Sequence, residues 1–158
     1  MGYSRSMRTL FVDADACPVT RDAVSIARSF GLSVMLVGNE SQNLSRHAGR
    51  SGVETVQVGA GRDAADFAIV ERLNRGDVVV TGDTGLAAMA LGRGAIPIGF
   101  RGRVFTLWTI DAEMEVRHAE QRHRRAGGRT RGPSAFTDED REHFRETLEQ
   151  VLREPAEG

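Results

Sequence analysis

A short apolar run that ends in two carboxylates constrains this chain more than any other stretch. Residues 9–12 read Thr-Leu-Phe-Val without polar alternation, which is typical of a strand buried on both faces of a parallel sheet. Asp13 and Asp15 follow, and Pro18 suits the first turn of a helix, where its missing N–H costs nothing. The pattern predicts a strand-to-helix turn whose acids lie at the carboxyl end of a strand, where open α/β sheets bind ligands.

Strands and helices alternate along the chain as far as residue 99. Apolar runs bounded by turn residues predict further strands over 32–37, 53–58, 77–83 and 95–99. Helical spacing predicts helices over 18–30, over a stretch that opens within 59–66 and runs to 76, and over 84–91, with a loop and a short helical piece over 38–52. This order predicts an α/β protein, a three-layer α/β/α fold with a mostly parallel central sheet of about five strands.

The last third of the chain has a different character. A helix is predicted over 109–126, followed by a flexible basic link over 127–133. Thr137 is then expected to cap a final helix, because three acids follow it in the first turn. The apolar stripe that packs this helix on the body is expected to consist of Phe144, Leu148, Val151 and Leu152.

The length of 158 residues suits one domain with a substantial core. We expect this domain to span 7–153, with an α/β core over 7–99 and a C-terminal helical extension over 100–153. Residues 1–6 and 154–158 are expected to be disordered tails. The formal net charge of −1 favours no class of partner, but all 21 basic residues are arginine, so chemistry that needs a lysine is excluded.

Five carboxylates fall where a doubly wound sheet brings strand ends together: Asp13, Asp15, Asp63, Asp66 and Asp83. Each acid alone also suits a helix cap or a turn, so the coincidence is what favours a site. Like charges held close raise each other's pKa unless a cation compensates, and Mg²⁺ or Mn²⁺ binds through such carboxylates. The sequence therefore predicts one or two of these ions, with Thr81 orienting a carboxylate or a water.

The residues at the first strand end also suit two other chemistries. An Asp-x-Asp also suggests a haloacid-dehalogenase-like phosphatase with Asp13 as nucleophile and Asp15 as acid, but that scheme usually needs a lysine. Cys17 at a helix N-terminus is a candidate nucleophile. No His lies near it in the sequence, so closing a tight turn is its favoured role. A single cysteine and the lack of a run of roughly 18 apolar residues predict a cytoplasmic protein without a membrane span.

Arginines concentrate in residues 117–131, with Glu120 as the single acid among them. With two upstream neighbours, the set is Arg101, Arg103, Arg117, Arg122, Arg124, Arg125, Arg129 and Arg131. Such a run is usually a solvated face, yet arginine forks suit phosphate oxygens and a local basic patch is the footprint of backbone binding. The predicted partner is nucleic acid, RNA above all. The sequence is also compatible with a homodimer.

Five blocks of the sequence resemble, in order, the signature blocks of the YaiI/YqxD family of bacterial proteins. They are Asp13–Pro18 (Asp-Ala-Asp-Ala-Cys-Pro), Gly61–Ile69, Gly76–Ala87, Arg101–Thr106 and Gly132–Arg141. The family has no established activity and is regarded as PIN-like in fold, and PIN-like domains resemble metal-dependent nucleases. The resemblance implies that the metal-binding acids are Asp13, Asp63, Asp66 and Asp83, with Asp15 a further candidate. The chain departs from commoner members at Gly82, where a bulkier residue often stands.

The leading hypothesis is a cytoplasmic PIN-like nuclease, dependent on Mg²⁺ or Mn²⁺, that hydrolyses phosphodiester bonds in RNA or single-stranded DNA. In it the four metal-binding acids are the catalytic residues and the arginine-rich segment holds the strand. The phosphatase is the first alternative. The second is a non-catalytic nucleic-acid-binding or adaptor protein that keeps the acidic residues without turnover.

Overall fold

The structure, a computed structural model, describes residues 8–61, 63–129 and 134–154. Within them, five strands form one sheet in the order β3-β2-β1-β4-β5, and every neighbouring pair is parallel. The strands are β1 (Thr9–Asp13), β2 (Ser33–Gly38), β3 (Val53–Gln57), β4 (Val78–Val80) and β5 (Ile96–Ile98). The helices are α2 (Thr20–Ser29), α3 (Ser41–Ser45), α4 (Ala64–Val70), α5 (Thr84–Gly92), α6 (Ile110–Arg125) and α7 (Asp138–Arg153).

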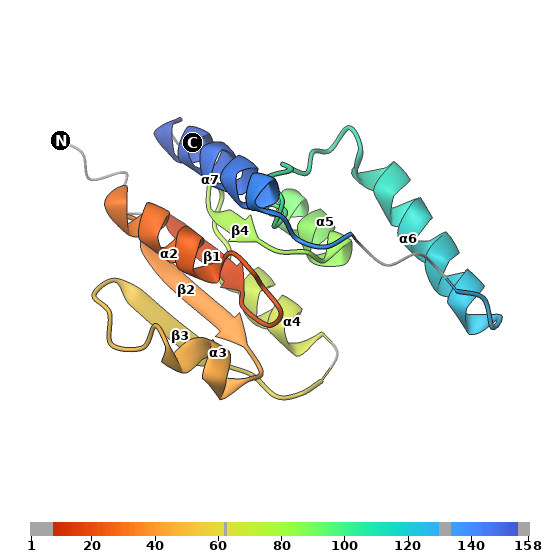
Figure 1. Cartoon of the computed structure of the whole chain (residues 1–158), viewed down its shortest axis with the longest axis horizontal. Coiled ribbons are helices and arrows are strands. Elements are labelled where there is room, and N and C mark those ends of the chain that lie inside the picture. The colour runs from red at the N-terminus through yellow and green to blue at the C-terminus, as the bar shows by residue number, and fades with distance from the viewer. Residues whose placement is uncertain (1–7, 62, 130–133, 155–158) are drawn as a thin grey trace.

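The central strand β1 is buried on both faces, and its side chains divide between two apolar clusters. Leu10 and Val12 pack with α2, α3 and α7 on one face of the sheet. Phe11 points to the other face and packs with α4 and α5. Helices therefore cover both faces (Figure 1), which confirms the predicted three-layer α/β/α fold.

The strand order reverses direction between β1 and β4. The chain first moves outward from β1 through β2 to the edge strand β3, and then returns through α4 to place β4 on the other side of β1. Such a switch point opens a crevice at the carboxyl ends of the strands, where ligands of open α/β sheets bind. Asp13 ends β1 there, and Asp83 follows β4.

The two C-terminal helices are attached differently. Thr137 caps α7 through a capping box with Asp140, as predicted, and Phe144, Leu148 and Leu152 are buried against the body. By contrast, α6 buries Ile110 alone, in a small cluster with α5. Figure 1 shows α6 reaching away from the sheet at one end of the molecule.

The helix predicted to end at Gly76 is shorter than expected, and some predicted segments lie outside the described residues. The helix expected to run to Gly76 ends as α4 at Val70, because the amides of Arg72 and Leu73 bond three residues back, in tighter turns. The predicted tail 1–6, residues 155–158 of the predicted tail 154–158, and Arg131 lie outside the described residues, whereas the Glu154 carbonyl accepts a 3.2 Å hydrogen bond from Arg8. None of the described helices is both long and apolar enough to cross a membrane.

Candidate active site

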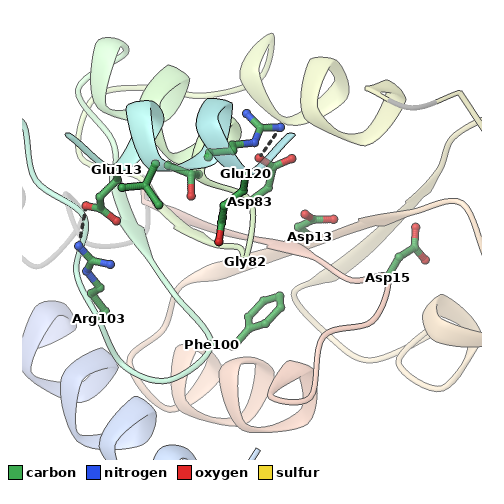
Figure 2. A pocket seen from close by; sticks show the side chains of 11 residues that line it. Asp13, Asp15, Gly82, Asp83, Phe100, Arg103, Glu113 and Glu120 are labelled. Carbon is green, nitrogen blue, oxygen red and sulfur yellow. Dashed lines mark ion pairs between the residues drawn. The ribbon is translucent and has the colours of Figure 1, made fainter. Parts of the chain in front are cut away.

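A cavity of about 730 Å³ opens at the carboxyl ends of β1 and β4. We call it the acidic pocket; the charged and aromatic residues that line it are Asp13, Asp15, Asp83, Phe100, Arg103, Glu113, Arg117 and Glu120. Figure 2 shows Asp13 and Asp83 facing the same space, with Glu113 and Glu120 entering from α6 and Phe100 on the opposite wall. The switch point thus holds carboxylates from three separate parts of the chain.

Asp13 sits at the floor of the pocket and is held by Thr81. The Thr81 hydroxyl, fully buried, donates a hydrogen bond of 3.1 Å to Asp13 Oδ2 and accepts one of 3.0 Å from the Asp83 amide. The pKa of Asp13 is raised to about 6, mainly by burial and also by the charges of Asp83 and Asp15, while the Thr81 hydrogen bond acts in the opposite direction. This hydrogen bond to Asp13 is the contact through which Thr81 can orient a carboxylate.

Asp66, on α4, is not among the residues that line the pocket, but it lies close enough to the other acids for their charges to act on it. Its side chain is only 8% exposed, and burial, followed by the charges of Asp83, Asp13 and Asp63, raises its pKa to about 6. Asp63 precedes α4 at its N-cap position and is exposed. The fold thus gathers Asp13, Asp66 and Asp83 into one electrostatic group and leaves Asp63 at its outer edge.

Asp83 serves two partners within the structure. Its Oδ1 accepts a 2.7 Å bond from the Gly85 amide and so caps α5, and it also lies 3.6 Å from Arg117 Nη2. Arg117 was predicted to contact nucleic acid from the arginine-rich segment. It lines the acidic pocket, where the charge of its guanidinium lowers the pKa of Asp66.

Asp15 also lines the pocket, but its carboxylate is already engaged. It accepts hydrogen bonds from the Asn39 amide (2.6 Å), the Glu40 amide (3.3 Å) and the Asn43 side chain (3.0 Å). These bonds tie the turn after β1 to the start of α3. The side chain comes so close to β2 that a Cβ atom on Gly38 would lie 2.8 Å from it. This geometry favours a structural role over metal binding.

Sequence reasoning missed Glu113 and Glu120, which line the pocket from α6. The spacing of residues 113, 117 and 120 places them on one helix face, and that period was the available signal. Glu113 pairs with Arg103 at 2.7 Å, so this predicted nucleic-acid contact also lies at the pocket wall. The arginines at the C-terminal end of α6 drew attention away from the acids on its pocket-facing side.

Phe100 fits the pocket because residue 82 is glycine. A Cβ atom at Gly82 would lie 2.8 Å from the Phe100 ring, a distance that real contacts do not show. Glycine at position 82 therefore admits an aromatic ring beside Asp83. This pairing required the fold and left no trace in the local sequence.

The other predicted arginines divide into two groups. Arg101 binds the N-terminal part of α7, through a 2.8 Å ion pair with Asp140 and bonds to Ser134, so it holds the C-terminal helix in place. The remaining described ones, at the end of α6 and just after it, have exposed side chains: Arg122, Arg124, Arg125 and Arg129. They are placed where a ligand can reach them.

Cys17 does not have the environment of a nucleophile. Burial raises the pKa of its thiol to about 11, and the charges of Asp13 and Asp22 act in the same direction. It is packed against the apolar cluster shared by β1, α2 and α7. The structure agrees with the favoured prediction, a small residue that closes a tight turn.

Whether these residues suit a metal depends on donor chemistry and on geometry. Carboxylate oxygens are the ligands that Mg²⁺ and Mn²⁺ prefer, and the pKa of Asp13 and of Asp66 is raised first by burial and then by the negative charges of neighbouring acids. Among the described residues, however, no three His, Cys, Asp or Glu side chains converge as ligands. The donor set fits a hard cation, but the carboxylates must turn toward one point to hold it.

Fold and pocket together define an α/β protein with an acidic crevice at the switch point of a parallel sheet. Residues 11–154 match the family model described as "Uncharacterized BCR, YaiI/YqxD family", and the chain belongs to that family. A UPF0178 protein of Exiguobacterium sibiricum is 42% identical over 145 residues, 92% of this chain and 96% of that protein. A UPF0178 protein of Parvibaculum lavamentivorans is 41% identical over 147 residues, 93% and 95% of the two chains. No solved structure matches the chain significantly.

Proposed function

We propose that the acidic pocket is the active site of a metal-dependent nuclease that hydrolyses phosphodiester bonds in RNA or single-stranded DNA. One observation carries the proposal. Asp13 and Asp66, from separate elements, are both held with a pKa of about 6 by burial and by the nearby charge of Asp83. Carboxylates crowded in this way concentrate at functional sites, and a divalent cation relieves their repulsion.

In this proposal Asp13, Asp66 and Asp83 hold Mg²⁺ or Mn²⁺. The bound ion supplies a water of lowered pKa and stabilises charge that develops on the phosphate. Thr81 fixes Asp13 through Oδ2 alone, and Oδ1 makes no hydrogen bond to the described residues, so it remains available as a ligand. Asp63, at the outer edge, adds negative charge without contact to Asp13.

Arg117 is the residue that changes partner. Its guanidinium stands beside Asp83 as a substitute cation, and at 3.6 Å the pair is loose enough to part. We expect Asp83 to exchange this partner for the ion, which frees Arg117 to contact a phosphate oxygen. Phe100 on the opposite wall offers a ring on which a base can stack, a contact suited to single strands.

The same ion pair favours one second candidate, the non-catalytic nucleic-acid-binding protein. An arginine that already neutralises Asp83 permits a stable acidic pocket without any metal. The two candidates differ in what happens when metal and RNA are added together, so they are separated by experiment.

The first test is calorimetric titration of Mn²⁺ into metal-free protein at pH 7.5. The nuclease proposal expects saturable binding that the Asp13→Asn/Asp83→Asn variant loses and the exposed control Asp111→Asn/Asp138→Asn keeps. Arg117→Ala should bind Mn²⁺ several-fold more tightly, because the competing cation is gone. Unchanged binding in the Asp13→Asn/Asp83→Asn variant would exclude these acids as ligands.

The second test offers end-labelled RNA, the matching single-stranded DNA and p-nitrophenyl phosphate to the Mn²⁺-loaded protein. Cleavage of a polynucleotide, abolished by Asp13→Asn, supports the nuclease. Turnover of the small phosphomonoester alone would support the phosphatase with Asp13 as nucleophile. RNA that is bound but stays intact would move the non-catalytic function to the front.

A further inference from the structure

A second cavity, of about 650 Å³, lies on the other side of the turn that joins β1 to α2. We call it the basic cavity; its charged and titratable lining residues are Arg21, Asp22, Arg46, His47, Arg50 and Arg141. The two cavities share the same turn, because Asp13 and Asp15 line the acidic pocket while Ala14 and Cys17 line the basic cavity.

Positive charge in the basic cavity is not balanced by the protein. Four arginines face one aspartate in its lining. That aspartate, Asp22, is already paired, with Arg141 at 2.5 Å and with Arg145 at 2.8 Å. Within the described part of the chain, Arg21, Arg46 and Arg50 form no ion pair, so their charge is available to an anion from solution.

His47 provides an independent sign of a missing partner. Its side chain is 6% exposed, it lines the basic cavity, and its buried Nδ1 has no hydrogen-bond partner among the described residues. Burial and then the charges of Arg50, Arg21 and Arg46 lower its pKa, which places those three guanidinium groups close to the ring. Buried polar atoms in native proteins are nearly always bonded, so this ring nitrogen is expected to meet a ligand oxygen.

The start of α2 adds to the positive potential. Thr20 and Arg21, from the first turn of this ten-residue helix, and Pro18, which precedes its N-cap, line the basic cavity. No side chain caps its N-terminal amides. Free amides and the positive end of a helix dipole attract anions, phosphate in particular.

We propose that the basic cavity binds a phosphate group of the nucleic-acid strand whose neighbouring nucleotide lies in the acidic pocket. Arg46 and Arg50 are the principal ligands, with His47 donating to a phosphate oxygen once it is protonated or its Nδ1 carries the hydrogen. Arginine forks match phosphate oxygens in geometry. A volume of about 650 Å³ lies within the range of roughly 300–1,000 Å³ of sites that hold nucleotide-sized ligands.

The path of the strand rests on the proposed function, whereas phosphate binding in the cavity does not. The test is therefore done without metal, in EDTA, where no hydrolysis by a metal-dependent site occurs. Its first readout is the NMR signal of the His47 ring, assigned by its loss in His47→Ala. Inorganic phosphate should shift this signal in the wild-type protein and leave it in place in Arg46→Ala/Arg50→Ala.

The second readout is fluorescence anisotropy of a labelled eight-nucleotide RNA, with and without a 5′-phosphate. Arg46→Ala/Arg50→Ala should weaken binding by about tenfold or more and reduce the slope of log K against log salt by about 0.7. The matched control, Arg93→Ala/Arg153→Ala, removes two exposed arginines that line neither cavity and should bind as wild type. A loss confined to the 5′-phosphorylated RNA assigns the cavity to a terminal phosphate, and a loss with both RNAs assigns it to an internal one.

The outcomes separate the two proposals. Unchanged RNA affinity in Arg46→Ala/Arg50→Ala, or an equal loss in the control, overturns the basic cavity as a strand-binding site. A His47 signal that moves with phosphate while RNA affinity stays unchanged overturns the nucleic-acid source and leaves a site for small phosphorylated ligands. If phosphate and RNA bind as expected and Mn²⁺ still does not, the nuclease fails and the basic cavity stands.

Discussion

The acidic pocket gathers carboxylates and the basic cavity gathers arginines, and a single turn separates the two. Among the acids, burial acts on the charged groups themselves. It disfavours the ionised form of Asp13 and Asp66 and so raises the pKa of both. In the basic cavity the arginines stay exposed, and the cost falls on His47 behind them, whose pKa is lowered. A fold can thus hold like charges together either by burying them or by burying the group they repel.

The turn between the two cavities is itself strained. Ala16 has a φ of 59°, the one positive value among the described residues that are not glycine. A left-handed alanine costs about 1–2 kcal/mol, and such strain persists where the surroundings enforce it. Here the bonds of Asp15 to the α3 segment enforce it. Ala16 thus lies in the turn whose residues line both cavities.

Neutralising Asp13 should give the largest effect, and it should be stabilising. Because the folded pKa is raised from 3.8 to about 6, the folded state holds its proton more tightly, and stability falls as the pH rises from about 4 to about 6. Asp13→Asn keeps an acceptor for Thr81 and should raise the free energy of unfolding by about 2 kcal/mol at pH 8 in EDTA, after discounting for partial exposure. Urea titration at pH 8 and pH 4 measures it, and the gain should vanish at pH 4.

Equal stability of Asp13→Asn and wild type at pH 8 would mean that the acidic cluster is not strained, and its resemblance to a metal site would lose its physical basis. Asp111→Asn, which removes an exposed carboxylate on α6, is the control and should change stability little at either pH.

Removing Asp15 should loosen the wall between the cavities. Asp15→Ala deletes the acceptor of three hydrogen bonds to the α3 segment, and we expect a loss of about 1 kcal/mol, since the bonds are partly exposed. Phosphate binding by the basic cavity should weaken, because α3 leads into Arg46 and His47, while Mn²⁺ binding stays. Calorimetry with both ligands measures this, and a variant that loses Mn²⁺ binding alone would make Asp15 a metal ligand.

The fold could be predicted from the sequence because buried elements carry recognisable patterns of apolar residues. An unbroken apolar run for β1 and the stripe of α7 each follow from one repeating contact, so both were found. The same local logic located Asp13, Asp66 and Asp83, since the ends of parallel strands meet at one edge whatever the details. Loop acids after strands are positions that topology alone brings together.

What the sequence could not give were pairings between side chains distant along the chain. Arg101 and Arg117 belong to one composition class but hold α7 and Asp83 respectively, and nothing local distinguishes them. The basic cavity was missed for the same reason, because Arg21 and Arg50 are isolated in sequence and meet only through the packing of α2 beside the α3 segment. The sequence shows charges that are close along the chain, but it does not show charges that only the fold brings together.

His47 should show the opposite pH response to Asp13, with a smaller size. Its lowered pKa means that the unfolded state binds the proton more tightly, so stability rises with pH toward 6.5, the ordinary value for histidine. His47→Gln removes this titration and should flatten the acid side of the stability profile. The controls are the exposed His118 and His123, and an equal change in His118→Gln/His123→Gln would contradict the assignment.

Cys17 supplies the smallest effect, since it borders both clusters without serving either. A thiol with a pKa of about 11 is almost wholly protonated at pH 8, and iodoacetamide should therefore modify it on the order of 100-fold more slowly than a free cysteine. Cys17→Ser should leave Mn²⁺ and phosphate affinities unchanged. Rapid alkylation that also blocks phosphate binding would show a thiolate exposed to the arginines, and the basic cavity would then belong to cysteine chemistry instead of strand binding. Slow alkylation with both affinities intact would mean that the carboxylates bind Mn²⁺ and the arginines bind phosphate without any part played by Cys17.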